Sequence, residues 1–355
     1  MLILVAENPQ SNSYTSSLLN AYQSIGHTVV CDPHNFFYSN LIPEILHIHW
    51  PERLYHWYPL SEKPDNLKID LLREKLCHYK NKGTVIVFTV HDLILHFSTN
   101  RKLDEKIFNL IIEHSDIISH HCSKSLEMFS KLYPIALSKV NIIDHHGDYL
   151  IDYKYITKKE ARSKLNISDE KFVILNFGSQ QSYKGREFID KVFNSCAINS
   201  KYLITAGNYY YRGLSLIKKF VMEIRNNMKE KNNFRNKKYI YRSIDNNEIP
   251  VLFNASDIVL LGHKAGLVSG IIPMAATFSK PVIYPDIGCF KEQMKDWIGS
   301  AYEAGNLKQA CDSLNDIYKK MKDDKLFLDN SIWMQKNSWN KHVELILQTV
   351  NKFKN

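Results

Sequence analysis

The chain places side chains that can do chemistry directly after short apolar runs. His91 and Asp92 follow "TVIVFTV", Glu52 follows "ILHIHWP", and Lys184 lies in the glycine-bounded loop "FGSQQSYKG". Carboxylates and imidazoles move protons in general acid–base catalysis. A lysine among glycines can reach a phosphate group, because glycines let the backbone approach a ligand closely. These residue types predict a site that combines acid–base groups with anion binding.

The loop from Gly178 to Gly185 precedes the helical pattern "REFIDKVF". It has the order of a phosphate-binding loop, but it matches neither the Walker A sequence nor G-x-G-x-x-G. A plain turn between strand and helix fits the same letters. Lys184 therefore predicts a phosphate site only together with a second anion-binding element.

That second element is predicted in "VSGIIPMAATFSKPVIYP", residues 268–285. Serine is a preferred N-cap, so we expect a helix that is entered at Ser269 and carries Pro273 in its first turn. The first N–H groups of a helix have no partner within it. The amides of Ser269 and Gly270 are therefore expected to point outward, where they and Lys184 would neutralise one diphosphate. A capped helix without a ligand is the alternative.

A metal site is not expected, although the chain has 15 histidines. The neighbouring pairs His120–His121 and His145–His146 would point to opposite faces of a strand, which does not suit a shared metal ion. The chain contains no Asp-x-Asp and no Cys-x-x-Cys. Cationic and backbone groups would have to hold any diphosphate.

The elements that must position these residues alternate along the whole chain. Ten short apolar runs alternate with helical patterns, which is typical of βαβ units and parallel sheets. Ligands of such folds lie at the carboxyl ends of the strands. The length of 355 residues predicts two domains, and the polar stretch from Asp148 to Lys171 is the expected junction. The strand ends of the two sheets would face each other across a cleft.

Charge and hydropathy indicate an anionic partner. The net charge is +9, and the segment from Lys218 to Lys238 holds eight basic and two acidic residues. Nucleic acid, anionic lipid and nucleotide phosphates all fit, and so does a solvated helix face followed by a polar loop. No apolar run approaches the ~18 residues of a spanning helix, and "MLILVAENPQ" reads as a strand and not as a signal peptide. We expect a cytoplasmic protein.

The aromatic stretch "HWPERLYHWYPL" contains Trp50, Arg53, Tyr55, Trp57 and Tyr58. It fits a loop that packs on the sheet, a platform for a sugar ring, or an aromatic and cationic contact with a membrane interface. We expect an anionic membrane surface as a partner, on the inner face of the plasma membrane.

Taken together, these motifs resemble the GT-B glycosyltransferases, specifically the retaining bacterial type of family 4, in a branch that builds surface polysaccharides. The fragments that carry the resemblance are "HIHWPE", "FTVHDL", "HSDIISHHCSKS", "DHHGDY", "NFGSQQSYKG", "ITAGN", "NNEIPVLFNASDIVLLGHK", "SGIIPMAATFSKPVIYPDIG" and "NSWNKHVELILQTV". The resemblance implies two Rossmann-like, doubly wound α/β domains. Residues 1–160 would bind the acceptor, residues 161–335 would bind the donor, and the helix within 336–355 would cross back onto the first domain.

The resemblance also implies roles on the donor side. Lys184 resembles the lysine that binds the donor phosphate, Gly178 the glycine of that loop, and Ser269 with Gly270 the pair whose amides hold the diphosphate. His91 resembles the histidine near the donor sugar.

Two departures affect this donor side. Gln181 stands where the branch commonly has arginine, and Lys264 stands where a basic residue is usual. The wider family has a pair of glutamates that this chain lacks, since Gly266 and Met274 lie near their places. The residue that recognises the ribose therefore stays unassigned.

The implied reaction is a metal-independent transfer of a sugar, expected to retain configuration, from a UDP- or GDP-linked donor to a glycan or lipid-linked glycan, with no other cofactor. His91, Asp92 and Lys184 are the expected catalytic residues, and Asp92 or Glu52 would be the base if the reaction inverts. The expected acceptor-side residues are Asn12, His49, Trp50, Glu52 and His146. A non-catalytic nucleotide- or nucleic-acid-binding α/β protein is the alternative, although no nucleic-acid module is recognisable and nucleic acid is not an expected partner.

Overall fold

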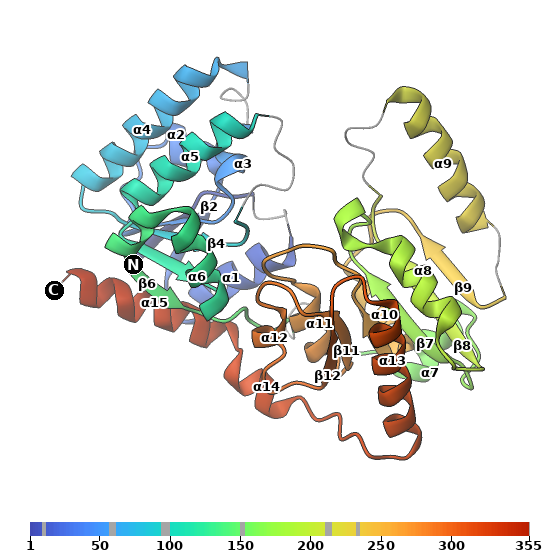
Figure 1. The fold of residues 1–355 in the computed structure, drawn as a ribbon. Helices are drawn as coiled ribbons and strands as arrows, with labels where there is room; N and C mark the ends of the chain where they lie inside the picture. The colour runs from blue at the N-terminus through green and yellow to red at the C-terminus, as the bar shows by residue number, and fades with distance from the viewer. Residues whose placement is uncertain are drawn as a thin grey trace. The chain divides into compact units, whose positions relative to one another are not determined.

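The computed structural model describes residues 1–8, 12–56, 62–93, 100–149, 153–209, 215–231 and 235–354. The chain divides into two compact units, each with its own parallel sheet (Figure 1). Unit 1 comprises Met1–Gly147 and Lys336–Asn355, and unit 2 comprises Asp148–Gln335.

The sheet of unit 1 has six parallel strands in the order β2-β1-β3-β4-β5-β6. The three strands β3, β4 and β5 are fully buried, which explains why their sequences are apolar without alternation. The strands are β1 (Leu2–Val5), β2 (Thr28–Cys31), β3 (Ile45–Ile48), β4 (Val85–Val90), β5 (Ile117–His120) and β6 (Val140–Ile143).

The helices of unit 1 cover this sheet and begin and end at recognisable signals. The side chain of Asn12 accepts the N–H of Thr15 at 2.9 Å and so caps the first helix, and Gly26 with φ +86° follows its end. The helices are α1 (Ser13–Ser24), α2 (Pro33–Tyr38), α3 (Pro51–His56), α4 (Asp65–Asn81), α5 (Arg101–His114), α6 (Ser123–Leu132) and α15 (Trp339–Lys354), with a 3-10 helix at Pro134–Ser138.

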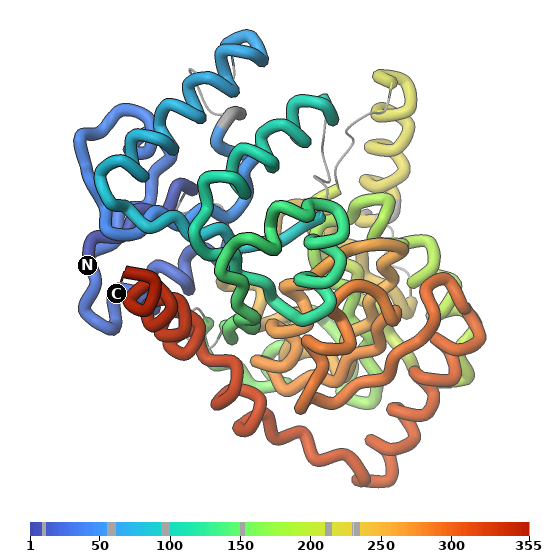
Figure 2. The backbone as a smooth tube through the Cα atoms, turned by 60° about the vertical axis from the view of Figure 1, so that its left-hand side comes forward, coloured from blue at the N-terminus to red at the C-terminus, as the bar shows by residue number. Residues whose placement is uncertain are grey.

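The last helix belongs to unit 1 although it comes from the far end of the chain. Its buried stripe, which includes Val343, Ile346 and Val350, shares one core with Ile3 of β1 and Leu18 of α1. Figures 1 and 2 both show α15, in red, beside the N-terminal segments in blue. One residue of this stripe is polar, His342, and it enters the site described below.

The sheet of unit 2 also has six parallel strands, in the order β12-β11-β10-β7-β8-β9. The strands are β7 (Phe172–Phe177), β8 (Lys201–Ala206), β9 (Lys237–Ile240), β10 (Ile258–Leu260), β11 (Val282–Pro285) and β12 (Gly299–Tyr302). The helices are α7 (Lys158–Leu165), α8 (Arg186–Ser195), α9 (Leu216–Lys231), α10 (Ile249–Ala255), α11 (Ile271–Thr277), α12 (Phe290–Gln293), α13 (Leu307–Lys322) and α14 (Ser331–Lys336), with a 3-10 helix at Ser182–Lys184.

Two strands of unit 2 were not among the ten that the sequence predicts. Both lie at an edge of the sheet, where one side of the strand has no neighbour to bury it. "KKYI" of β9 carries two lysines, as edge strands often do, and "GSAY" of β12 has three small residues before its tyrosine. Neither gives the apolar signal of a buried strand.

The division between the units falls at Gly147, earlier than the expected boundary at residue 160. Tyr149 and Tyr153 pack on the core of unit 2, and the N–H of Tyr149 donates to the Thr277 hydroxyl at 3.0 Å. The polar stretch after Asp148 is therefore part of unit 2 from its start. Within the described residues, every helix is too short or too polar to cross a bilayer.

Candidate functional site

The first candidate site lies in unit 1, at the carboxyl ends of its strands. The ring of Tyr14, from the start of α1, is the centre of an aromatic cluster. Its centroid is 4.7 Å from that of His91, 4.8 Å from that of Trp339 and 5.0 Å from that of His146. His91 follows β4 and His146 follows β6, so loops that are far apart in the sequence meet on this one tyrosine.

His49 and Trp50, which follow β3, complete the cluster. His49 Nδ1 and His91 Nε2 are 3.1 Å apart, within hydrogen-bond distance. The ring of His91 also stacks on Trp50, with centroids 4.2 Å apart and an angle of 16° between the planes. These contacts fix the orientation of both imidazoles.

Burial keeps these imidazoles neutral. His49, His91 and His121 are almost wholly buried, and because burial disfavours the charged form, the pKa of each lies well below its usual value. Burial also lowers the pKa of His146 to about 4. Neutral imidazoles both donate and accept hydrogen bonds, so the cluster suits hydroxyl groups better than anions.

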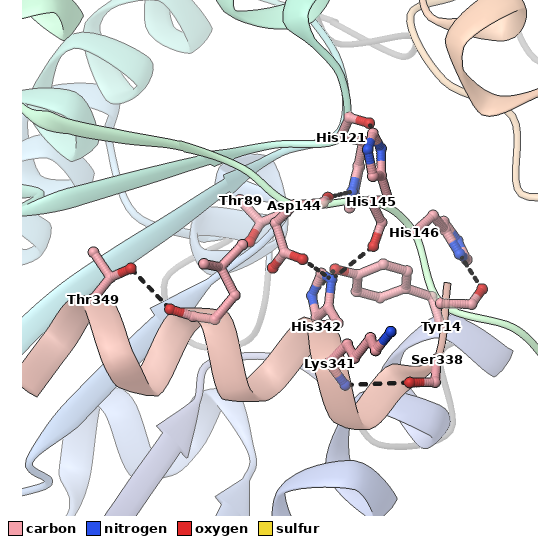
Figure 3. A network of polar contacts seen from close by, with 12 residues as sticks. Tyr14, Thr89, His121, Asp144, His145, His146, Ser338, Lys341, His342 and Thr349 are labelled. Carbon is pink, nitrogen blue, oxygen red and sulfur yellow. Dashed lines mark hydrogen bonds and ion pairs between the residues drawn. The ribbon is translucent and has the colours of Figure 1, made fainter. Parts of the chain in front are cut away.

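One histidine of the cluster has the opposite shift. Burial alone would lower the pKa of His342, but the Asp144 carboxylate raises it above the usual value. His342 Nδ1 lies 3.0 Å from Asp144 Oδ1 and 3.0 Å from the carbonyl oxygen of His145 (Figure 3). Its Nε2 is 3.5 Å from the Tyr14 hydroxyl. His342 thus connects the C-terminal helix to the tyrosine at the centre.

Acidic groups lie at one side of the cluster. Glu7, after β1, forms an ion pair with Arg53 at 3.0 Å, and the Arg53 guanidinium lies 4.5 Å from the centroid of Trp50. Glu52 is partly buried and its pKa is raised to about 7, mainly by burial, with a further contribution from the charge of the Asp92 carboxylate. Near neutral pH, Glu52 therefore exists in both protonation states.

Several buried polar atoms around the cluster have no hydrogen-bond partner among the described residues. They are His49 Nε2, His121 Nε2, Glu52 Oε2 and Glu7 Oε2. An unpaired buried polar atom costs about 1–3 kcal/mol. A polar ligand would remove that cost, which marks this edge of the sheet as a binding site.

The sequence predicts part of this site. His49, Trp50, His91 and His146 do come together, and the Asp92 carboxylate is near enough to raise the pKa of Glu52. The structure shows Asn12 as the cap of α1. The aromatic residues Trp57 and Tyr58 lie outside the described residues.

Other residues of the cluster are absent from the sequence prediction, namely Tyr14, His121, Asp144, Trp339 and His342. Two of them leave a signal in the sequence. Tyr14 is the first member of the stripe that continues with Leu18 and Tyr22, and His342 interrupts the apolar stripe of α15.

The second candidate site lies in unit 2, where the loops after β7, β8 and β10 touch through their backbones. A Cβ on Gly207 would lie 2.0 Å from the carbonyl oxygen of Gly178, and one on Gly185 would lie 1.9 Å from that of Gly262. No side chain fits at these distances. The glycines, which have no side chain, therefore let the three loops approach one another closely at the carboxyl edge of the sheet.

The side chain of Lys184 reaches back to the start of its own loop. A Cβ on Gly178 would lie 3.4 Å from Lys184 Nζ and 3.3 Å from the side chain of Ile271, the first residue of α11. The backbone N–H of Lys264 donates to the carbonyl oxygen of Tyr183 at 2.7 Å, which places the next loop beside Lys184. Lys184, Gly178 and the start of α11 are thus neighbours.

The prediction for Ser269 is confirmed in part. The helix begins at Ile271, one residue later than expected, and the Ser269 hydroxyl accepts the N–H of Ile271 at 3.4 Å, as a capping side chain does. The Ser269 N–H does not point outward but donates to Gln293 Oε1 at 3.0 Å, while Gln293 Nε2 donates to the Ser269 carbonyl oxygen at 3.2 Å. The Gln293 side chain of α12 thus bonds to both the N–H and the carbonyl oxygen of Ser269. Of the two amides predicted to bind an anion, that leaves the amide of Gly270.

The remaining donor-side residues have the following surroundings. Gln181 donates from its side chain to the Ser179 hydroxyl at 3.3 Å, and its carbonyl oxygen accepts the N–H of Lys184 at 3.0 Å. Lys264 is exposed. Met274 stands near the place of one of the wider family's glutamates, and its side chain is buried in the core of unit 2.

Arg186 was not among the predicted residues. It is 9% exposed and comes directly after Gly185. Its guanidinium carbon lies 5.0 Å from the ring centroid of Tyr209 and 5.2 Å from that of Tyr241, the aromatic residues that follow β8 and β9. This stacking fixes the start of α8, and with it the end of the Lys184 loop.

No group of three or more His, Cys, Asp or Glu side chains within the described ranges is arranged to hold a metal ion. In particular, His91, His121 and His146 pack on one another and on Tyr14 as rings.

Comparison with known proteins identifies the fold. No family model and no curated protein matches the sequence. Sucrose-phosphate synthase from Thermosynechococcus elongatus superposes with a TM-score of 0.73 at 12% identity, covering 99% of this chain and 98% of that one. Anabaena HepE in complex with UDP and glucose gives 0.70 at 12% identity, with 99% of each chain covered. A glycosyltransferase from Rickettsia africae gives 0.68 at 13% identity, with 100% and 98% covered.

The two Rossmann-like α/β units therefore form a GT-B fold, and the fold prediction is confirmed. Sequence identities of 12–13% show the fold and not the specific family 4 branch, so membership of that branch stays a prediction.

Proposed function

We propose that the chain is a glycosyltransferase that moves a sugar from a nucleoside diphosphate to an acceptor hydroxyl. One observation supports this most: Lys184, Gly178 and the start of α11 are neighbours at the carboxyl edge of the unit 2 sheet. Ligands of doubly wound folds bind at this edge. The neighbour HepE was solved with UDP and glucose, which agrees with a nucleotide-linked donor.

Unit 2 would bind the donor, a UDP- or GDP-linked sugar. As the sugar–oxygen bond breaks, negative charge develops on the leaving diphosphate, and groups already aimed at that charge lower the barrier. Lys184 would supply the main charge. The Gly270 amide, Gln181 and the exposed Lys264 would contact the same phosphates.

Unit 1 would bind the acceptor through its neutral histidine cluster. His49 Nε2 and Glu52 Oε2 are buried without a hydrogen-bond partner among the described residues, and sugar hydroxyls would supply those partners. His91, held between Trp50 and Tyr14, would orient the sugar being transferred. We expect retention of configuration, and Glu52, with a pKa of about 7, or Asp92 would be the base if transfer inverts.

The acceptor would be a glycan or a lipid-linked glycan of bacterial surface polysaccharide synthesis. A membrane-bound acceptor agrees with the net charge of +9 and with the cation–π pair of Arg53 and Trp50 at the start of the aromatic stretch. Contact with the inner face of the plasma membrane by a cytoplasmic enzyme is part of this proposal.

A screen of UDP- and GDP-sugars, with and without EDTA, tests the proposed activity. We expect slow release of nucleoside diphosphate from at least one donor, nearly unchanged by EDTA, because Lys184 and backbone amides take the place of a metal ion. Loss of release on chelation, restored by Mn²⁺ or Mg²⁺, would contradict metal independence. If no donor reacts while an oligonucleotide binds in a steeply salt-dependent way, a non-catalytic nucleic-acid-binding protein is the better account.

A further inference from the structure

Helix α9 is attached to unit 2 by its polar side. Asn226 is 2% exposed, and its side-chain oxygen accepts a hydrogen bond from Arg186 Nη1 at 3.3 Å. The carboxylate of Glu230 accepts the backbone N–H of Tyr241. In Figure 1, α9 (yellow) lies at the margin of unit 2, beyond β9. Its polar side therefore faces the protein.

The opposite side of α9 is apolar and exposed. Its large side chains are exposed over much of their surface: Leu216 85%, Ile217 78%, Phe220 64%, Val221 55%, Ile224 44% and Met228 58%. At 3.6 residues per turn they fall within an arc of about 140°, centred roughly opposite Asn226. Surface helices normally bury such a face against the core. In α9 it points away from the core, and no residue that the structure describes covers it.

Basic residues border this face. The exposed Lys218 and Arg225 lie along its edge beside Val221, and α9 as a whole carries five basic and two acidic residues. A helix with a broad apolar face and Lys or Arg beside it is typical of helices that lie in a membrane interface. Anionic lipid headgroups would neutralise these cations, whereas a second copy of the chain would bring like charges together.

We propose that α9 is the surface by which unit 2 docks on an anionic lipid bilayer, with the apolar side chains inserted and Lys218 and Arg225 among the headgroups. The inference deepens the proposed function, on whose membrane contact it rests, by naming a surface for that contact, and it uses none of the residues assigned to donor or acceptor. Arg186 links the two regions, since it holds Asn226 of α9 and directly follows the Lys184 loop.

Vesicle flotation of the full chain tests this inference with a matched pair of variants. Phe220→Glu removes an exposed aromatic from α9, and Phe327→Glu makes the same change at a side chain of unit 2 that is 81% exposed and outside any helix. On vesicles that contain phosphatidylglycerol, we expect Phe220→Glu to lower partitioning at least about 10-fold, because the buried apolar area is lost. Phe327→Glu should bind like the wild type, and both variants should keep its melting temperature.

A second pair tests the role of charge. Lys218→Gln with Arg225→Gln should weaken partitioning about 25-fold, since each cation near an anionic surface contributes about a factor of five. The exposed pair Lys308→Gln with Lys319→Gln, on α13, is the control and should change little.

Three results would overturn the proposal: no flotation of the wild type with anionic vesicles, equal flotation of all variants, or a wild-type dimer that Phe220→Glu converts to a monomer. Release of nucleoside diphosphate by the same variants is read in parallel and should stay unchanged. That readout separates a failure of docking from a failure of the proposed activity.

Discussion

Lys184→Ala is expected to lower the rate of transfer by ~10²–10³-fold while weak donor binding persists. The ammonium lies beside Gly178 and the first residue of α11, where the leaving diphosphate would rest. Removing it takes away charge stabilisation that grows as the bond breaks, and adds neither bulk nor repulsion. The loss should therefore appear mainly in kcat, measured as nucleoside diphosphate release together with donor affinity by calorimetry.

Two further variants make this result specific. Lys191→Ala removes an exposed lysine from α8 of the same unit and should leave kcat unchanged. Gly270→Glu should abolish donor binding and keep the fold, because Gly270 has φ −63°, which any residue adopts, and acidic residues are favourable at a helix start. Normal turnover by Lys184→Ala, with the fold intact, would remove Lys184 from the mechanism.

Acid is expected to unfold unit 1 selectively. Burial lowers the pKa of His47 to about 3 and those of His120 and His146 to about 4, and His49, His91 and His121 are shifted well below the usual value. The unfolded chain binds protons on these groups below about pH 6.5, whereas the folded unit does not. Their stabilisation is present above that pH and is lost as the pH falls.

The size of this effect is large. His47, His120 and His146 each remove roughly 2 kcal/mol between pH 6.5 and pH 5, at about 1.4 kcal/mol per pH unit, and His49, His91 and His121 act in the same direction. His342 and the carboxyl groups of Glu7, Glu52 and Asp144 act in the opposite sense, because their raised pKa values give stability at low pH that is lost as the pH rises. Six lowered groups outweigh four raised ones, so the free energy of unfolding should fall, and urea titrations from pH 8 to 4.5 with hydrogen exchange would locate the loss in unit 1.

A single substitution checks the origin of this pH dependence. His120 is wholly buried and bonded to Ser125 and Asn141, and His120→Gln should reduce the proton uptake on unfolding near pH 5 by about one. His34→Gln changes an exposed histidine and is the control. A free energy of unfolding that is constant from pH 7 to pH 5 would mean that the buried imidazoles do not govern the stability of unit 1.

The sequence predicts the elements whose periodicity is strong. Leu72, Leu76 and Tyr79, spaced as on one helix face, are the buried stripe of α4, and the helix expected within residues 336–355 is α15. The edge strands β9 and β12 escape prediction because they bury little and carry lysine or small residues. Local patterns thus identify the interior of the fold better than its margins.

The candidate sites divide in the same way. Strand ends locate His49, His91 and Lys184, since the carboxyl edge of a parallel sheet is fixed by topology. The partner of Ser269 could not be predicted, because Gln293 comes from another element and only packing brings it near. His342 likewise meets Asp144 across almost 200 residues of sequence.

Titration of the wild-type chain with UDP and GDP, against uridine and guanosine, tests the central claim most directly. If Lys184, Gly178 and the start of α11 form a diphosphate site, at least one nucleoside diphosphate should bind and raise the melting temperature, while its nucleoside binds far more weakly. The same affinity for nucleoside and diphosphate, or no binding of either diphosphate, would contradict the site and the glycosyltransferase proposed from it.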